Sequence, residues 1–365
     1  MWMPIRTNKS INHITAAYAA NKPKGLRRRR ADMSKISVLG AGTWGTALAI
    51  ELANKGQEVT LWSAVEREIT ALRNDRKNIP NLPGASLPDS VYLTTDLAEA
   101  CDDEEILVCA VASPYVRSTA KKIKQYCRKG QIIVNVSKGI EEKTLRTMTQ
   151  IISDEIPDAK VAVLSGPSHA EEVSRGIPTA VVVGADNKRV AKTVQEAFFS
   201  EMFRVYTCDD VLGIEIGGSL KNVIALAAGI ADGLGFGDNT KAALMTRGIA
   251  EISRLGVKMG AKQETFAGLS GVGDLIVTCA SNHSRNHNAG FLIGQGKTCE
   301  EAMKEVNQVV EGVNSAKAAL KLGRKYRVSL PIVQEVNDVL FNGESVRESL
   351  MDLLRRNPTV EYRRK

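Results

Sequence analysis

A glycine-rich segment near residue 40 has the residue types and spacing that bind a dinucleotide. Gly40, Gly42 and Gly45 form a G-x-G-x-x-G motif directly after a short apolar strand (36–39) and at the start of a helical stretch (44–54), which is the context this motif requires. The first glycine permits a tight turn, the second lets the backbone approach a pyrophosphate, and the third lets helix and strand pack closely. The pyrophosphate then rests on amide groups at the positive end of the helix dipole. The alternative, a glycine-rich turn without a ligand, is disfavoured by this context.

The sequence does not identify the contact to the adenosine ribose. An NAD-preferring site usually carries Asp or Glu about 20 residues after the glycines, at the end of the second strand. Here that strand ends at Ser63 and Ala64, and the next acids, Glu66 and Glu68, flank Arg67. No acid at the strand end repels a 2′-phosphate and no arginine there holds one. The sequence therefore does not distinguish NAD from NADP as the cofactor.

Four later motifs carry side chains that can hold and transform a polar substrate. Val-Ser-Lys-Gly-Ile (136–140) and Leu-Ser-Gly-Pro-Ser-His-Ala (164–170) each end a predicted core strand. Open α/β sheets bind ligands at the carboxyl ends of their strands, so both motifs fall where chemistry is expected. Gly-Gly-Ser-Leu-Lys-Asn-Val-Ile-Ala (217–225) and Gly-Leu-Ser-Gly-Val-Gly-Asp-Leu-Ile-Val-Thr-Cys (268–279) follow, and Ser-Arg-Asn (284–286) comes soon after.

The motifs must be positioned by secondary-structure elements, which are expected to alternate between strands and helices in the first part of the chain and to be helices in the rest. Strand candidates separated by helical or loop segments imply parallel pairing through right-handed crossovers, with both faces of the sheet covered. After about residue 210, apolar residues recur at helical spacing, and one run (244–255) is expected to end at Gly256. We predict an α/β N-terminal Rossmann domain (34–215) with a doubly wound, mainly parallel sheet, followed by an all-α C-terminal domain (216–360). The predicted strands are 36–39, 58–62, 106–111, 132–136, 161–164 and 180–183.

Net charge argues against a nucleic-acid partner. The formal charge is +8, but residues 1–32 contain eight Lys or Arg and one acid, whereas the rest of the chain has 41 basic and 40 acidic residues. The body is nearly neutral, so general attraction of nucleic acid is not supported. We expect residues 1–33 to be a disordered basic extension, or to precede the true start at Met33. A transit peptide is the alternative.

Membrane insertion, disulfides and metal binding are also not expected. No apolar run approaches the roughly 20 residues that cross a bilayer. The six cysteines are scattered without a C-x-x-C pair, which is typical of reduced, buried thiols. His283 and His287 are four residues apart, but no Cys, Asp or Glu ligand adjoins them, so no metal is expected.

Together the motifs, in this order and spacing, resemble the glycerol-3-phosphate dehydrogenases, specifically the bacterial NAD(P)-dependent biosynthetic type. The resemblance runs from about residue 34 to about residue 353, and it also covers Asp-Gly-Leu-Gly-Phe-Gly-Asp-Asn-Thr-Lys (232–241) and Val-Val-Glu-Gly (309–312). It implies a cleft between the two domains and usually a homodimer in the cytoplasm. It also implies reversible hydride transfer between NAD(P)H and dihydroxyacetone phosphate, giving sn-glycerol 3-phosphate for glycerophospholipid synthesis.

The same resemblance assigns the chemistry to a few residues. Lys221 looks like the catalytic lysine, which stabilises the charge on the carbonyl oxygen and delivers the proton; burial in a closed cleft can lower its pKa. Lys138 looks like a contact to both the substrate and the nicotinamide side of the cofactor. Asp274 would hold Lys221 or accept from a substrate hydroxyl. The alternatives are a surface lysine for Lys138 or Lys221, and a helix N-cap for Asp274.

The remaining site residues are implied by position within the matched motifs. Arg285 and Asn286 look like the phosphate grip, since a guanidinium can bind phosphate with two parallel hydrogen bonds. Further substrate contacts would be Gly166, Ser168, Asn222, Thr278 and Ser284. Cofactor contacts would be Gly40, Gly42, Thr43, Trp44, Gly45, Ala64, Lys138, Ala170, Arg285, Val309 and Glu311.

Alternatives are open at three positions. Glu311 can equally be an ordinary acid at a helix end, and His169 can contact a ligand or serve the fold alone. The family commonly carries Arg or His at or near the position of Ala64, against the adenosine ribose. The absence of that basic side chain at Ala64 argues against a preference for NADPH. Arg67 is a candidate to replace it.

Three other functions fit the sequence less well. A related two-domain dehydrogenase for a hydroxy acid, such as a 6-phosphogluconate or 3-hydroxyacid enzyme, also pairs a Rossmann domain with helices. The Ser-Lys-Gly motif (137–139) together with Ser-Arg-Asn (284–286) favours the glycerol phosphate reaction. A non-catalytic NAD(P)-binding sensor is disfavoured by the joint presence of the two lysines, Asp274 and Arg285. A nucleic-acid binder that uses the arginine run at 27–30 is disfavoured by the neutral body.

Overall fold

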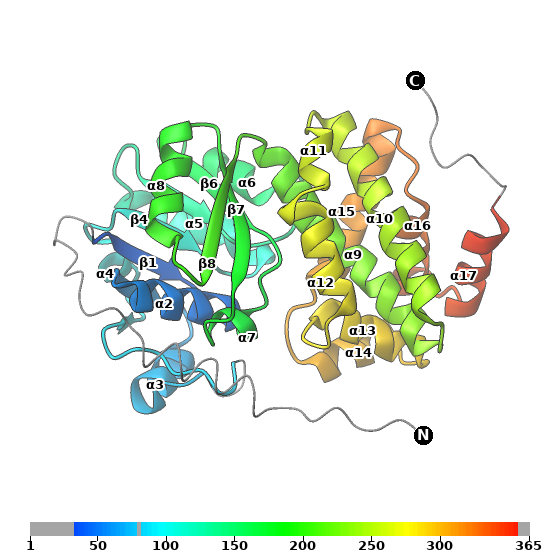
Figure 1. The fold of residues 1–365 in the computed structure, drawn as a ribbon, viewed down its shortest axis with the longest axis horizontal. Helices are drawn as coiled ribbons and strands as arrows, with labels where there is room; N and C mark the ends of the chain where they lie inside the picture. The colour runs from blue at the N-terminus through cyan, green and yellow to red at the C-terminus, as the bar shows by residue number, and fades with distance from the viewer. Residues whose placement is uncertain (1–32, 79–81, 357–365) are drawn as a thin grey trace. The chain divides into compact units, whose positions relative to one another are not determined.

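A computed structural model of the chain describes residues 33–78 and 82–356, so residues 1–32 of the predicted basic extension (1–33) lie outside the described residues. The first part holds an eight-stranded sheet in the order β3-β2-β1-β4-β5-β6-β7-β8. Figure 1 shows this sheet with helices packed around it. Neighbouring strands are parallel except for the antiparallel pair of β6 and β7. The predicted mainly parallel α/β sheet is confirmed. The strands are β1 Lys35–Leu39, β2 Glu58–Trp62, β3 Tyr92–Thr94, β4 Ile106–Cys109, β5 Ile132–Asn135, β6 Lys160–Ser165, β7 Thr179–Ala185 and β8 Phe203–Cys208.

All six predicted strands occur, and the two that the sequence did not reveal lie at the edges of the sheet. β3 has only three residues, and β8 buries alternate side chains while exposing the others. Edge strands lack a second neighbour, so they do not need the continuous apolar run that marks a strand buried on both faces. A search for apolar runs therefore passes over them.

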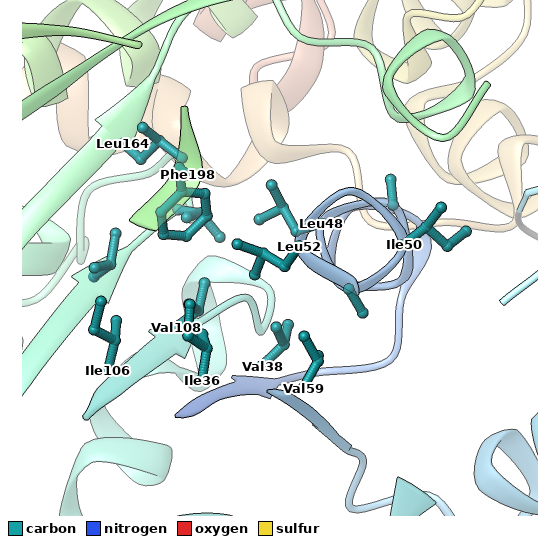
Figure 2. Packing of buried hydrophobic residues seen from close by; sticks show 14 of the residues in the cluster. Ile36, Val38, Leu48, Ile50, Leu52, Val59, Ile106, Val108, Leu164 and Phe198 are labelled. Carbon is teal, nitrogen blue, oxygen red and sulfur yellow. The ribbon is translucent and has the colours of Figure 1, made fainter. Parts of the chain in front are cut away.

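Buried side chains alternate between the two faces of the sheet. Ile36 and Val38 of β1 pack on one face with the helices α2 and α8, whereas Leu39 packs on the other face with α5 and α6. Figure 2 shows Leu48 and Leu52 of α2 turned toward the strands. Each fully buried aliphatic side chain of this kind contributes about 1.5–3 kcal/mol, and the packing fixes α2 against the end of β1.

After β8 the described chain is helical (Figure 1), as predicted. The helices among the strands are α2 Thr43–Lys55, α3 Glu66–Asp75, α4 Leu97–Cys101, α5 Val116–Ile123, α6 Met148–Glu155, α7 Ala170–Val173 and α8 Lys188–Phe198, with short 3-10 turns η2 Ser113–Tyr115 and η3 Lys124–Tyr126. Those after the sheet are α9 Val211–Gly233, α10 Asp238–Met259, α11 Gln263–Phe266, a π-turn η4 Leu269–Gly273, α12 Asp274–Ala280, α13 Arg285–Gly294, α14 Cys299–Val306, α15 Glu311–Tyr326, α16 Pro331–Phe341 and α17 Val346–Arg355.

Helix α9 is the core of the helical part. It is packed by α10, α12, α13, α15 and α16, so it is apolar around nearly its whole circumference. Its length and apolar composition suffice for a membrane span, contrary to the expectation that no such run exists. However, 89% of its most apolar stretch is buried inside the protein. Packing of the surrounding helices thus accounts for its composition.

Helices α9 and α13 touch backbone to backbone through glycines. A Cβ added at Gly229 or Gly233 of α9 would lie 2.0 or 2.3 Å from a carbonyl oxygen of α13. A Cβ added at Gly290 or Gly294 of α13 would lie 2.2 or 2.3 Å from a carbonyl oxygen of α9. No side chain fits between the two helices at these positions, so the glycines fix their separation.

One helix boundary expected from the sequence is wrong. The run 244–255 was expected to end at Gly256, but α10 continues to Met259 and its left-handed cap is Gly260, with φ of 108°. An added Cβ at Gly256 would lie 2.2 Å from the ring of Phe266. This glycine makes room for an aromatic side chain and does not end the helix.

We predict that Gly290→Ala destabilises the protein by about 3 kcal/mol, because backbone atoms of α9 cannot move aside as a side chain can. Alanine is otherwise the better helix former by about 1 kcal/mol, so the sign of the change is diagnostic. Gly237→Ser is the control, since Gly237 is the N-cap of α10 and no described atom lies within 4 Å of its added Cβ. Urea unfolding measures both, and unchanged stability of Gly290→Ala would contradict the close packing.

Candidate active site

A buried carboxylate joins two lysines from different parts of the fold. Asp274 begins α12 and is 1% exposed. Its Oδ2 accepts a hydrogen bond of 2.7 Å from Nζ of Lys138, which follows β5, and its Oδ1 accepts one from Nζ of Lys221, in the middle of α9. Three residues that lie far apart in the sequence therefore form one charged cluster, and both lysines depend on the same carboxylate.

Lys221 is the more enclosed of the two lysines. Its ammonium also donates to Oγ of Thr278, which in turn donates to the carbonyl oxygen of Asp274 at 2.6 Å. The pKa of Lys221 is lowered to about 8, mainly by burial; Asp274 opposes this shift, and the positive charge of Lys138 adds to it. An amine with this pKa can both give and take a proton near neutrality. The surface alternative for Lys221 is excluded by its 5% exposure.

The loop that carries Lys138 is fixed from two sides. Nζ of Lys138 donates to the carbonyl oxygen of Gly166 at 3.2 Å, and Oγ of Ser168 donates to the same oxygen at 3.0 Å. The next residue, Gly139, accepts from Oγ of Ser219 in α9 at 3.1 Å. The side chain of Lys138 is 20% exposed, so it is not the freely solvated lysine of the alternative interpretation.

The first turn of α13 brings Asn286 against α9. Its Nδ2 donates to Oδ1 of Asn222 at 3.0 Å, and its Oδ1 accepts from the amide of Gly312 at 2.8 Å. Oγ of Ser284 accepts from the amide of His287 at 3.2 Å as the helix cap. The sequence predicted all three polar residues as substrate contacts, and in this structure each has a partner within the protein. Arg285, in contrast, is exposed.

The three histidines of this region do not form one cluster: His287 contacts Asp232, whereas His169 lies near His283. Nε2 of His287 lies 2.8 Å from Oδ2 of Asp232, and Nζ of Lys241 lies 2.7 Å from the same oxygen. Nε2 of His169 lies 3.3 Å from the carbonyl oxygen of Val277, and burial lowers its pKa. Its ring centroid is 5.9 Å from that of His283. The Asp232–His287 pair ties the end of α9 to the first turn of α13.

The glycine-rich turn has the geometry that a pyrophosphate requires. Gly40 has φ of +126°, and an added Cβ at Gly45 would lie 1.8 Å from the carbonyl oxygen of Gly40. Gly42 is the N-cap of α2 without a side-chain cap from a described residue, and no described atom lies within 4 Å of its added Cβ. Thr43 and Trp44, which open the helix, adjoin this free space. The turn therefore offers open amides to an anion.

Asn78 stabilises this turn, and sequence reasoning missed it. Its Nδ2 donates to the carbonyl oxygen of Ala41 and to Oγ of Thr46, both at 3.1 Å. The residue lies more than 30 positions downstream in a segment without a motif. No local signal in the sequence could have revealed it.

Glu311 connects the helical part to the sheet. It begins α15, and its carboxylate accepts hydrogen bonds from the amide of Ser113 at 3.0 Å and from Oγ of Ser113. Ser113 begins η2, just after β4, and was also missed. Its place beyond a strand's carboxyl end is the signal that could have found it. Of the other predicted cofactor contacts, Ala170 begins α7, while Ala64 and Val309 are exposed.

Comparison with known proteins identifies the family. The family model for the N-terminus of NAD-dependent glycerol-3-phosphate dehydrogenase matches residues 35–191, and the model for its C-terminus matches residues 210–351. The chain belongs to this family. Relatives named glycerol-3-phosphate dehydrogenase [NAD(P)+] include one from Agathobacter rectalis, 58% identical over 330 residues (90% of this chain, 98% of that protein), and one from Fusobacterium nucleatum, 56% identical over 331 residues (90% and 99%).

Solved structures of the family share the fold. The glycerol-3-phosphate dehydrogenase of Coxiella burnetii superimposes with a TM-score of 0.86 and 35% identity, covering 89% of this chain and 100% of that one. The enzyme from Saccharomyces cerevisiae does so with a TM-score of 0.76 and 25% identity, covering 89% and 100%. This chain therefore shares its fold, a Rossmann sheet followed by helices, with both of these enzymes.

We predict that Lys221 titrates near pH 8 and that Asp274→Asn lowers its pKa further, because the carboxylate is the main group that favours the ammonium form. The measurement is the pH dependence of the lysine Nζ resonances by nitrogen-15 NMR, with Lys221→Arg to assign the signal. Asp89→Asn is the control, because Asp89 is a surface carboxylate with a side chain 98% exposed. A wild-type pKa near the ordinary 10.5 would contradict the enclosed geometry.

Proposed function

We propose that this chain reduces dihydroxyacetone phosphate to sn-glycerol 3-phosphate with NAD(P)H, reversibly, and supplies glycerophospholipid synthesis. Membership in the glycerol-3-phosphate dehydrogenase family supports the reaction. The observation that carries the mechanism is the pair of ammonium groups that Asp274 draws together from two parts of the fold. An NAD(P)H-dependent reduction of a ketone needs positive charge and a proton donor at this kind of site.

Lys221 acts as the acid in reduction and the base in oxidation. When bound, the reduced nicotinamide supplies the hydride, which leaves negative charge on the carbonyl oxygen of the substrate. Lys221 stabilises that charge and gives its proton to the oxygen. Lys138 adds a second positive charge, and Asp274 orients both ammonium groups. Two cations sharing one anion leave a net charge of +1, which favours an incoming oxyanion over a neutral carbonyl.

Arg285 binds the phosphate of the substrate. It is exposed at the start of α13, so its guanidinium is accessible to an anion. Asn222 and Asn286 lock the first turn of α13 to α9, which sets the distance between this phosphate grip and Lys221. Gly166, Ser168, Thr278 and Ser284 complete the proposed substrate contacts.

Residues at the carboxyl ends of β1, β2 and β4 would hold the cofactor. The open N-terminus of α2 receives the pyrophosphate, and the cofactor contacts are Gly40, Gly42, Thr43, Trp44, Gly45, Ala64, Lys138, Ala170, Arg285, Val309 and Glu311. We further propose a Rossmann domain at 34–215 and a catalytic helical domain at 216–360. The assembly is a cytoplasmic homodimer with no nucleic-acid partner and no membrane partner.

The reaction is tested by mixing the protein with dihydroxyacetone phosphate and either NADH or NADPH, and following the loss of reduced-nicotinamide absorbance. Turnover with at least one cofactor supports the proposal. Cofactor binding without any turnover on dihydroxyacetone phosphate would instead indicate a different substrate or a non-catalytic sensor.

Lys221→Ala should reduce kcat by at least about 10³-fold, because it removes the acid and its charge from the transition state. NAD(P)H binding, measured by fluorescence, should be preserved. In the wild-type enzyme the rate of reduction should fall as pH rises through about 8, since the ammonium form is needed, and the rate of oxidation should rise over the same range. Lys297→Ala, at a surface pair with Glu305, is the control. A Lys221→Ala variant with near-normal kcat would refute the acid–base assignment.

Arg285→Ala should raise the KM for dihydroxyacetone phosphate by about 30- to 100-fold, because a charge-assisted contact to phosphate is lost. The change in kcat should be smaller than the change in KM. The rate on unphosphorylated dihydroxyacetone should fall much less, since that substrate has no phosphate to bind and only the proposed cofactor contact of Arg285 is lost. Steady-state kinetics on both substrates separates these effects, and equal losses on both would count against a phosphate grip.

A further inference from the structure

Ser63 occupies the place at which Rossmann sites usually carry the acid that binds the adenosine ribose. Strands β1 and β2 pair with Leu39 opposite Trp62, and the amide of Gly40 donates to the carbonyl oxygen of Trp62 at 2.8 Å. Ser63 therefore follows the strand end directly beside the glycine turn. It also comes 23 positions after Gly40, which matches the usual spacing of about 20. By register and by spacing, the missing acid belongs at Ser63.

A carboxylate from the next helix reaches this position in space. Oγ of Ser63 donates to Oε2 of Glu68 at 2.6 Å and accepts from the amide of Val65 at 3.1 Å. Ser63 is only 4% exposed, so its hydroxyl is a fixed partner within the protein. Glu68, in the first turn of α3, is thereby held against the end of β2. The sequence has no acid at the end of this strand, but the fold places the carboxylate of Glu68 there.

The other charges of this turn do not occupy the strand end in the same way. Glu66 accepts from Thr70 at 3.3 Å and lies 3.8 Å from Arg73, along the outer side of α3. Arg67 is exposed and Ala64 carries no charge. The group fixed at the end of β2 is therefore negative.

We propose that Glu68, held by Ser63, makes this chain prefer NADH to NADPH; the inference rests on the proposed use of a nicotinamide cofactor. A carboxylate at this place accepts a hydrogen bond from the 2′-hydroxyl of the NADH ribose. It repels the 2′-phosphate of NADPH, because like charges placed together are strongly unfavourable. Glu68 is thus the residue that determines specificity.

The test measures binding without substrate, so it does not depend on turnover. The Kd values of NADH and NADPH are obtained by fluorescence titration for the wild type, Glu68→Gln and Glu66→Gln. The wild type should bind NADH at least about tenfold more tightly than NADPH. Glu68→Gln should reduce that preference about tenfold, whereas Glu66→Gln, which removes the same charge two residues away, should change it by less than about twofold. Equal effects of the two substitutions, or tighter binding of NADPH by the wild type, would overturn the proposal.

Two further variants guard against a trivial loss of folding. Ser63→Ala releases Glu68 without changing any charge and should weaken the preference in the same direction. Ala64→Arg supplies a guanidinium and should tighten NADPH binding by about tenfold relative to NADH. Opposite shifts in either variant would refute the role of this strand end. Failure of the proposed function gives a different result, namely no reduction of dihydroxyacetone phosphate with either cofactor while the binding preference persists.

Discussion

The site depends on one carboxylate that serves two ammonium groups. Asp274 is almost fully buried and receives Lys138 from the sheet part and Lys221 from the helical part. Removing a lysine from water is costly, and a buried charge is tolerated only with a partner. Because one anion cannot neutralise two cations, the cluster retains a positive charge. Burial is the main cause of the lowered proton affinity of Lys221, and the charge of Lys138 adds to it. An incoming oxyanion can relieve the excess positive charge.

Helix α9 makes this arrangement possible. It carries Lys221 in its middle and meets α13 through glycines on both helices, so that the backbones themselves are in contact. Contacts through glycines fix the separation of two helices, but they do not prevent one helix from rotating or from sliding along the other. Polar contacts at the first turn of α13 supply that second constraint, through Asn286 to Asn222 and through His287 to Asp232. The helix turn that carries Arg285 is therefore held in a definite position relative to Lys221.

Carboxylates from the helical part also fix its junction with the sheet. Glu215 of α9 accepts from the amide of Thr149 at 2.9 Å in the first turn of α6, and burial raises the pKa of this glutamate. Glu311 binds Ser113 beyond the end of β4 in a similar way. Each carboxylate meets backbone amides at the beginning of a helical turn, where unpaired donors and the helix dipole favour negative charge. These contacts hold α9 and α15 against the part of the chain that carries the loop of Lys138.

The sequence by itself determined the features that local chemistry specifies. The turn at Gly40–Gly45, the buried strands and the change to helical periodicity near residue 210 follow from backbone freedom and apolar spacing, and the ordered motifs around Lys138, Lys221, Asp274 and Arg285 indicated the family. Tertiary structure alone decided what depends on contacts between distant segments. It paired β7 antiparallel to β6, placed β3 and β8 at the edges, and used Gly256 for packing against Phe266. It also brought Glu68 to Ser63 and Asn78 to the glycine turn. At these positions the role of a side chain depends on which distant segment packs against it. The periodicity of residues along one segment carries no information about that packing.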